Sequence, residues 1–273
     1  MTERLTGLTN TYHSYSLDEA LAGIAAAGFK SVELASVPGW TEHVLRDSGP
    51  DELAEVKALL DTYGLTAVSL AGHSDLVSEA GVAEFRKALK IAEHLGIGYV
   101  TTSTGGHDAS SGGSLEEQRD HFMTHIRPLA DEAAAMGITI CLETHGGLLA
   151  HGVMAKQLIA DIGKDNIGIN YDPGNVIFYG GVRPEDDIQA SADAVRHVHC
   201  KDQIGGPGVW NFPTVGTGEV NFAPIFAALD AKDFTGPVSV EIEFQGEPWP
   251  SLDVVNKAVA DSYTFVRQFV KDE

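Results

Sequence analysis

Short runs of β-branched and other apolar residues alternate along the chain with longer segments whose apolar residues recur every three or four positions. The short runs include VELAS, VSLAG, ITICLET, IGINYD and VSVEIEF, which carry apolar residues on both faces of an extended strand. Such runs are typical of parallel strands that helices cover on both sides. The pattern predicts strands that end near the following residues: Thr11, Ser36, Ala71, Ser103, Glu143, Asp172, His199 and Glu241.

Helix start and stop signals lie in the gaps between these strands. Ser16 and Glu19 match a capping box, and Gly28 suits the C-terminal end of the same helix. Ser114 and Glu117 repeat the box before a second amphipathic segment. Strands and helices are therefore predicted to alternate along the whole chain.

Eight such units in 273 residues predict a single (β/α)8 TIM barrel domain over residues 1–273. An open, doubly wound sheet is the alternative, but no G-x-G-x-x-G motif follows the first strand. The stretch QIGGPGVWNFPTVGTGEVNF after the seventh strand is rich in Gly and Pro, and no GK[ST] follows it. We expect a loop over the mouth of the barrel, where the active sites of this fold lie, rather than a phosphate cradle.

The overall charge excludes two classes of partner. The chain carries 18 Lys and Arg against 39 Asp and Glu, a formal net charge of −21, which would repel nucleic acid and anionic membranes. Cys141 and Cys200 form no C-x-x-C pair, and we see neither a signal-peptide pattern nor an apolar run of membrane-spanning length. We expect a cytoplasmic protein, with a homo-oligomer left open.

The ends of the last four predicted strands carry three carboxylates and one imidazole. Glu143, Asp172, His199 and Glu241 would all face the mouth of a barrel. Three carboxylates that point at one another would repel and raise each other's pKa unless a cation lay between them. This donor set suits Mn²⁺ or Mg²⁺ better than a structural zinc. We expect one divalent ion, Mn²⁺ first, with Mg²⁺, Co²⁺ or Zn²⁺ as alternatives.

The stretch HVHCKD, residues 197–202, contributes one of these ligands. His197 and His199 leave an extended strand on the same side, and His197 lies one layer nearer the start of the strand. Lys201 has the same parity, so it should point inward, to contact an oxyanion of the substrate or to pair with a neighbouring acid. Glu241 and Glu243 also share strand parity, so either could be the fourth ligand. Glu241 is the expected one, because it lies as far into its strand as His199 does.

At this point the chain resembles the sugar phosphate isomerase/epimerase family of the xylose-isomerase-like TIM-barrel superfamily, which includes tagatose epimerases and inosose isomerases and dehydratases. The likeness extends from SLDEALAGIAAAGFKSVELA through GTGEVNFAPIFAAL to GPVSVEIE. The family motif H-x-K-D selects His199. The resemblance implies that the metal ligands are Glu143, Asp172, His199 and Glu241.

The resemblance also implies the catalytic groups. His145 follows Glu143 by two residues, as a general base does in family members with E-x-H, and an imidazole titrates near neutral pH. Glu143 and Glu241 are the other expected catalytic residues. Four further residues are expected to contact the substrate: His73, His107, Asn175 and Lys201. Asn175 stands where many epimerases of the family have a histidine, Leu149 where they have a glutamate, and Gly205 where they have an arginine.

These features predict a divalent-metal-dependent sugar isomerase or epimerase acting on a polyhydroxylated ketone: a ketose, an inosose or a 3-keto sugar. The reaction would remove a proton beside the ketone and pass through a metal-stabilised enediolate. The alternative is a dehydratase or eliminating lyase on a keto-sugar or a cyclic keto acid. The sequence offers no cluster of arginines for a phosphate. A non-catalytic binding subunit stays open, whereas the net charge of −21 opposes a DNA endonuclease with this barrel.

Overall fold

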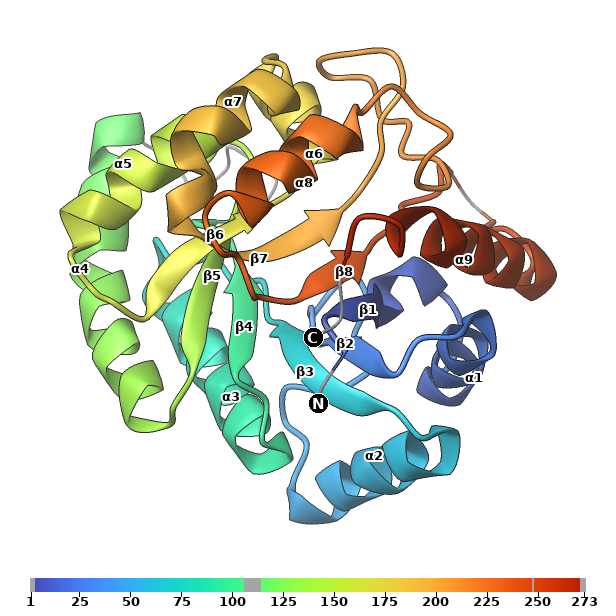
Figure 1. Cartoon of the computed structure of the whole chain (residues 1–273). Coiled ribbons are helices and arrows are strands. Elements are labelled where there is room, and N and C mark those ends of the chain that lie inside the picture. Colours follow the sequence, from blue (N-terminus) through green and yellow to red (C-terminus); the bar gives the residue numbers. More distant parts are fainter. Residues whose placement is uncertain (1–2, 106–113, 247, 271–273) are drawn as a thin grey trace.

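The computed structural model describes residues 3–105, 114–246 and 248–270. Eight parallel strands close into a barrel in the order β1 to β8, with helices around the outside (Figure 1). The prediction of a (β/α)8 barrel is therefore confirmed. The strands are β1 Leu5–Leu8, β2 Ser31–Ala35, β3 Thr66–Ala71, β4 Tyr99–Thr102, β5 Thr139–Glu143, β6 Ile167–Tyr171, β7 Val195–Cys200 and β8 Val238–Val240.

Helices follow the strands and pack against their outer faces. The α-helices are α1 Leu17–Ala27, α2 Pro50–Tyr63, α3 Glu79–Leu95, α4 Leu115–Ala135, α5 Gly152–Ile162, α6 Pro173–Asn175, α7 Pro184–Ser191, α8 Phe222–Asp230 and α9 Leu252–Val266. The described residues also form short helical turns at η1 Thr9–Tyr12, η3 Val176–Gly180 and η4 Ala192–Ala194. Within the described ranges, no helix combines the length and apolar character needed to cross a membrane.

The predicted caps form as the sequence indicates. The Ser16 side chain accepts a hydrogen bond from the backbone N–H of Glu19, and the Glu19 carboxylate accepts one from the backbone of Ser16. Ser114 and Glu117 make the same reciprocal pair at the start of α4. Gly28 ends α1 with φ of 111°, a conformation that favours glycine.

One predicted strand end is wrong. β2 to β8 end within one residue of the expected positions, but β1 ends at Leu8, not near Thr11. Residues Thr9–Tyr12 form the turn η1 instead, and two threonine hydroxyls in it bond to backbone groups of neighbouring segments. The Thr9 hydroxyl accepts a hydrogen bond from the backbone of Ala35 at 2.8 Å, and the Thr11 hydroxyl accepts one from the backbone of Ile242 at 3.0 Å.

The apolar core lies between the barrel and the helices, whereas part of the barrel interior is polar. Glu33, Ser69, Thr101, His197 and Ser239 come from five strands and are all fully buried. They form a hydrogen-bonded layer inside the barrel, because buried polar groups need partners. This polar layer lies directly beneath the mouth.

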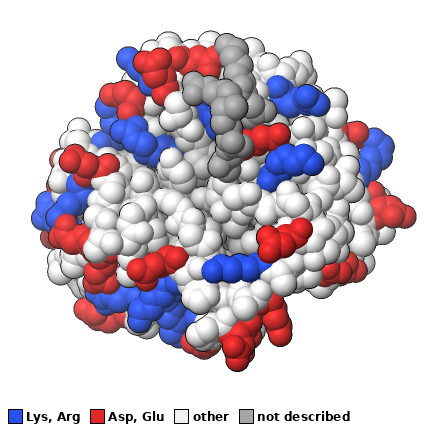
Figure 2. Space-filling view, turned by 60° about the horizontal axis from the view of Figure 1, so that its bottom comes forward, with Lys and Arg blue, Asp and Glu red and all other residues white. Residues whose placement is uncertain are grey.

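The surface carries charges of both signs. On the face seen in Figure 2, Lys and Arg side chains are interspersed with Asp and Glu, and neither sign forms a continuous field. On this face the excess of acidic residues does not form one continuous patch.

Candidate metal centre and active site

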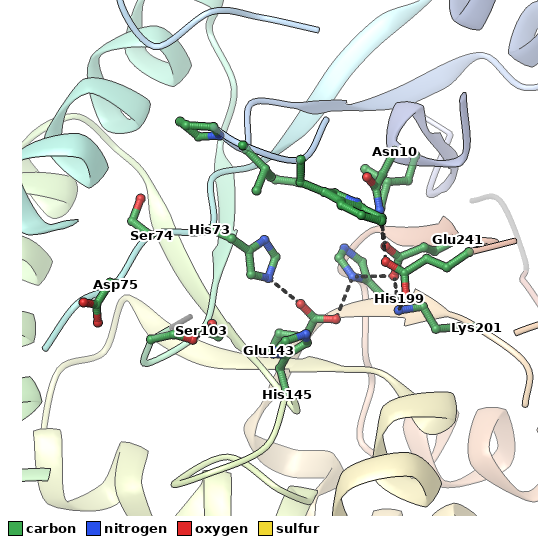
Figure 3. Close-up of a pocket in the computed structure, with 18 of the residues that line it drawn as sticks. Asn10, His73, Ser74, Asp75, Ser103, Glu143, His145, His199, Lys201 and Glu241 are labelled. Carbon is green, nitrogen blue, oxygen red and sulfur yellow. Dashed lines mark hydrogen bonds and ion pairs between the residues drawn. The ribbon is translucent and has the colours of Figure 1, made fainter. Parts of the chain in front are cut away.

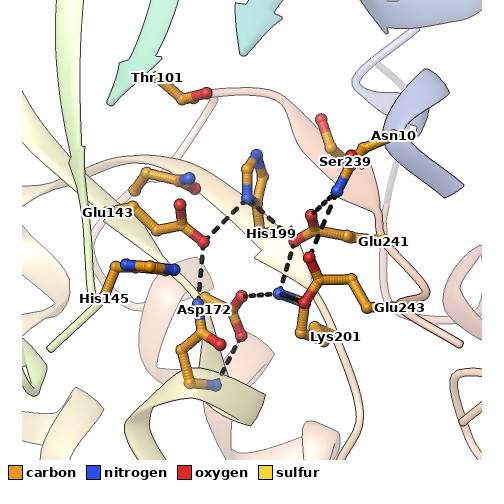
Figure 4. Close-up of polar contacts among 12 residues, drawn as sticks. Asn10, Thr101, Glu143, His145, Asp172, His199, Lys201, Ser239, Glu241 and Glu243 are labelled. Atoms are coloured by element: carbon orange, nitrogen blue, oxygen red, sulfur yellow. Dashed lines mark hydrogen bonds and ion pairs between the residues drawn. The ribbon is translucent and has the colours of Figure 1, made fainter. Parts of the chain in front are cut away.

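Four side chains from neighbouring strands meet at the C-terminal mouth of the barrel. Glu143 ends β5, Asp172 follows β6, His199 lies near the end of β7, and Glu241 follows β8 (Figure 4). Each offers one ligand atom, and these atoms all lie within 4.8 Å of one another. All four residues are buried. The structure thus brings together the residues that the sequence singled out as metal ligands.

The geometry of this group fits a cation. The Nδ1 atom of His199 lies 3.2 Å from Oε1 of Glu143 and 3.2 Å from Oε2 of Glu241. Oδ2 of Asp172 and Oε2 of Glu241 are buried and accept no hydrogen bond from any described residue. A buried carboxylate oxygen without a donor is costly unless a positive charge compensates it. Three carboxylates and one imidazole are a donor set that suits a divalent ion.

Lys201 supplies positive charge beside the same group. Its Nζ atom lies 3.2 Å from Oδ2 of Asp172, 3.0 Å from Oε2 of Glu241 and 3.0 Å from Oε2 of Glu243. The side chain is buried and also lies over the ring of Phe212. Burial would lower the pKa of Lys201, but the three carboxylates outweigh it and raise that pKa well above its ordinary value. Lys201 points inward as predicted, and pairs with neighbouring acids.

Burial and neighbouring charges shift the pKa values of all four candidate ligands. Burial, together with the nearby carboxylates, raises the pKa of Asp172 well above its ordinary value, despite Lys201. Burial also acts on Glu143 and Glu241, but neighbouring cationic groups hold the pKa of Glu143 well below its usual range and lower that of Glu241 to about 2. The pKa of His199 is raised well above its ordinary value, because the surrounding glutamates outweigh its burial. In the metal-free protein, the protons bound to Asp172 and His199 and the ammonium of Lys201 therefore compensate the negative charge of the carboxylates.

A cavity of about 440 Å³ opens over three of the candidate ligands, Glu143, His199 and Glu241 (Figure 3). One wall is largely apolar and includes Val37, Pro38 and Trp40 from the loop after β2. The Trp40 ring stacks on His13 with 4.4 Å between centroids and stays 42% exposed toward the cavity side. Trp210, from the Gly- and Pro-rich segment after β7, also lines the cavity, so that segment does form a loop at the mouth.

Two of the predicted histidines line this cavity. His145 lies beside Tyr179, with 3.3 Å between its Nε2 atom and the Tyr179 hydroxyl. His73, expected to contact substrate, forms a hydrogen bond with Oε2 of Glu143. The rings of His73 and His145 are 6.0 Å apart. Both imidazoles therefore lie near Glu143. His73 bonds directly to its carboxylate, and His145 lies nearer the opening of the cavity.

Two predicted substrate contacts, Asn175 and His107, do not line the described part of the cavity. Asn175 is buried and does not line the cavity. Its side-chain amide donates to Oε1 of Glu143 at 3.0 Å, and its backbone N–H donates to Oδ1 of Asp172 at 2.9 Å. Asn175 therefore orients two candidate ligands. His107 lies outside the described residues.

Sequence reasoning missed two polar residues of this site. The Asn10 side chain donates to Oε1 of Glu241 at 3.0 Å. Glu33, fully buried on β2, has both carboxylate oxygens 3.2 Å from Nε2 of His199. Burial would raise the pKa of Glu33, but His197 and His199 together hold it well below its ordinary value. The available signal was the single glutamate inside the apolar strand SVELA.

Comparison with known proteins agrees with this fold and site. L-ribulose 3-epimerase from Methylomonas sp. strain DH-1 is 28% identical over 241 residues, which cover 82% of this chain and 77% of the relative. Inosose dehydratase from Geobacillus thermodenitrificans strain NG80-2 is 28% identical over 152 residues, 47% of this chain and 48% of the relative. A crystal structure of D-psicose 3-epimerase shares the fold, with a TM-score of 0.80 at 18% identity and coverage of 98% and 99%. The family model described as xylose isomerase-like TIM barrel matches residues 21–260, and the chain belongs to this family, as its sequence motifs indicated.

Proposed function

We propose that the protein is a divalent-metal-dependent epimerase of unphosphorylated ketoses that inverts the carbon next to the ketone. At the level of enzyme class, the expected isomerase or epimerase is confirmed by the relatives. The observation that carries the finer proposal is the buried group of Glu143, Asp172, His199 and Glu241, of which all but Asp172 line an open cavity. The L-ribulose 3-epimerase that matches 82% of the chain supports a ketose as substrate.

The four ligands would hold the metal, for which Mn²⁺ is our first expectation. A divalent ion in such a site supplies Lewis acidity, which weakens the bond to a proton beside a ketone. The negative charge of the three carboxylate ligands and their burial away from bulk water favour a tightly held cation.

Inversion of a carbon centre needs one proton carrier on each face of the substrate. Glu143 and Glu241 come from β5 and β8 and approach the centre from opposite sides (Figure 4). His145 also follows β5, so it serves the same face as Glu143. We assign proton transfer on one face to Glu143 with His145, and on the other face to Glu241.

The charges around the cavity favour a substrate without phosphate. Among the described residues that line it, Lys201 is the only Lys or Arg, and three carboxylates already pair with its ammonium. Glu243 and Asp75 line the cavity as well. A phosphate dianion would meet further negative charge there, whereas hydroxyl groups could bond to the carboxylates and imidazoles.

The test is turnover of L-ribulose, D-fructose and D-tagatose by the Mn²⁺-loaded protein in D₂O, followed by NMR and mass spectrometry. We expect an epimer that carries one deuterium at the inverted carbon. Product formation without incorporation of deuterium would argue against proton transfer through exchangeable side chains. A clear preference for the 5-phosphates of the same sugars would contradict the proposed substrate class.

A dehydratase is the second candidate, and one contact favours it. The charged, buried ammonium of Lys201 lies beside the candidate ligands, where it could donate a proton to a departing hydroxyl. The inosose dehydratase relative matches 47% of the chain. The same assay distinguishes the two reactions, because elimination of water yields a product 18 mass units lighter with the ultraviolet absorbance of a conjugated ketone.

A further inference from the structure

Glu33 links four strands inside the barrel. Its carboxylate accepts a hydrogen bond from the Thr101 hydroxyl at 2.8 Å and another from the Ser239 hydroxyl at 2.5 Å. The Nε2 atoms of His197 and His199 each lie 3.2 Å from its Oε2 atom. All five residues are buried. Of these five residues only His199 lines the cavity, so Glu33 reaches the site through His199 and does not itself face a substrate.

The two nitrogens of His199 face opposite ways. Nδ1 points toward Glu143 and Glu241, the candidate metal ligands, and Nε2 points toward Glu33. A neutral imidazole carries its hydrogen on one nitrogen and a lone pair on the other. A carboxylate that faces Nε2 can only accept, so it favours the hydrogen on Nε2 and leaves the lone pair of Nδ1 for a metal.

Ligand atoms of Glu33, His197 and His199 also lie within 4.8 Å of one another, close enough to hold a second metal ion. The hydrogen-bond partners argue against a second ion there. Every carboxylate oxygen of Glu33 and each ring nitrogen of the two histidines has a hydrogen-bond partner within the described chain. Asp172 and Glu241, in contrast, each have a buried oxygen that makes ion pairs but accepts no hydrogen bond among the described residues. The carboxylate oxygens that could still bind a cation therefore lie on the Nδ1 side of His199.

We infer that Glu33 is a positioning residue that holds His199 as the Nε2–H tautomer and presents Nδ1 to the metal. The carboxylate also makes the imidazole a better donor to the cation, since negative charge beside one nitrogen raises the basicity of the other. This inference rests on the proposed metal site, but not on the identity of the sugar.

The test measures binding of Mn²⁺ to the full chain by isothermal titration calorimetry after the metal has been stripped. Glu33→Gln keeps the shape of the side chain and removes its charge, and we expect Mn²⁺ affinity to fall by about 10- to 100-fold. Thr101→Val is the matched control, because it removes one donor to Glu33 and leaves the contact with His199; its affinity should stay near that of the wild type. A folded Glu33→Gln protein with wild-type affinity would overturn the inference.

A second measurement on the wild type does not depend on the folding of any variant. In ¹⁵N-histidine-labelled protein loaded with Zn²⁺, the His199 signals, assigned by comparison with His199→Gln, should show hydrogen on Nε2 and metal at Nδ1. Hydrogen on Nδ1 would overturn the inference, and so would the absence of bound Zn²⁺. Neither experiment uses a sugar, so inactivity toward ketoses would contradict the proposed function alone.

Discussion

The ammonium of Lys201 lies 3.0 Å from Oε2 of Glu241, a buried oxygen that accepts no hydrogen bond among the described residues. The ammonium of Lys201 is thus a cation of the protein itself that lies beside the proposed metal site. Asp172 and Glu243 also contact this ammonium, so one lysine compensates three carboxylates. The stability of the metal-free protein should depend on this lysine.

Lys201→Met should therefore destabilise the metal-free protein by about 3–5 kcal/mol, because it leaves buried carboxylates without their partner. Chemical denaturation measures this difference. Lys257→Met is the matched control, since Lys257 pairs with Asp261 on the exposed surface, where such a pair contributes only about 0–1 kcal/mol. Equal stability losses in the two variants would show that burial of the Lys201 pairs does not matter.

Metal binding should release protons. The pKa values of Asp172 and His199 are raised well above their ordinary values in the metal-free protein, and both groups must lose a proton to become ligands. The affinity for Mn²⁺ should therefore fall as the pH is lowered from 8 to 6. Calorimetric titrations in two buffers with different ionisation enthalpies count the released protons. Binding heats that do not depend on the buffer would contradict this prediction.

The pH dependence of stability has a defined sign for His199. Its pKa is higher in the folded, metal-free protein than in the unfolded chain, where it is about 6.5. The stability that protonated His199 contributes is therefore complete below pH 6.5 and is lost as the pH rises through the raised folded pKa. We expect thermal denaturation to show that added Mn²⁺ stabilises the protein more at pH 9 than at pH 6. The opposite trend would mean that His199 is not a ligand.

His145→Ala should lower turnover by about 10²- to 10⁴-fold, the usual cost of losing a general base. Its affinity for Mn²⁺ should change little, because His145 is outside the group of four candidate ligands. Steady-state kinetics and calorimetry measure the two effects separately. His94→Ala, at an exposed position near the end of α3, is the control and should keep full activity. Near-wild-type turnover of the His145 variant would remove this residue from the reaction.

Asp202 should hold the loop after β7 in place. Its buried carboxylate accepts hydrogen bonds from the backbone N–H groups of Gln203, Gly216, Gly218 and Val220 at 2.8 to 3.0 Å. Asp202→Ala leaves these donors without a partner, at a cost of about 2 kcal/mol or more. We expect faster proteolytic cleavage within residues 203–220.

The same loop carries Trp210 to the cavity, so the Asp202 variant should also bind substrate more weakly. We expect a higher KM and a smaller change in kcat, since the proposed proton carriers lie on other segments. Thr217→Val is the control, because its hydroxyl bonds within the loop to the backbone of Thr214 and not to Asp202. If both variants resist proteolysis as well as the wild type, Asp202 is not the anchor of the loop.

The sequence alone determined the succession of strands and helices and predicted which four side chains would meet at the mouth of the barrel. The evidence for both is local and can be read along the chain: the alternation of apolar runs, the capping boxes at Ser16 and Ser114, and the polar ends of four strands. Because parallel strands end on the same side of a barrel, local position was enough to predict that Glu143, Asp172, His199 and Glu241 would meet.

Only the tertiary structure decided which groups surround these ligands. Glu33 and His199 are 166 positions apart, and closure of the barrel brings their side chains together across its interior. The turn of α6 likewise placed Asn175 on Glu143 rather than in the cavity, and the hydroxyls of Thr9 and Thr11 bond to remote backbone groups beyond the end of β1. Such contacts depend on the distance between segments that are remote in the chain, and periodicity within one segment contains no information about that distance.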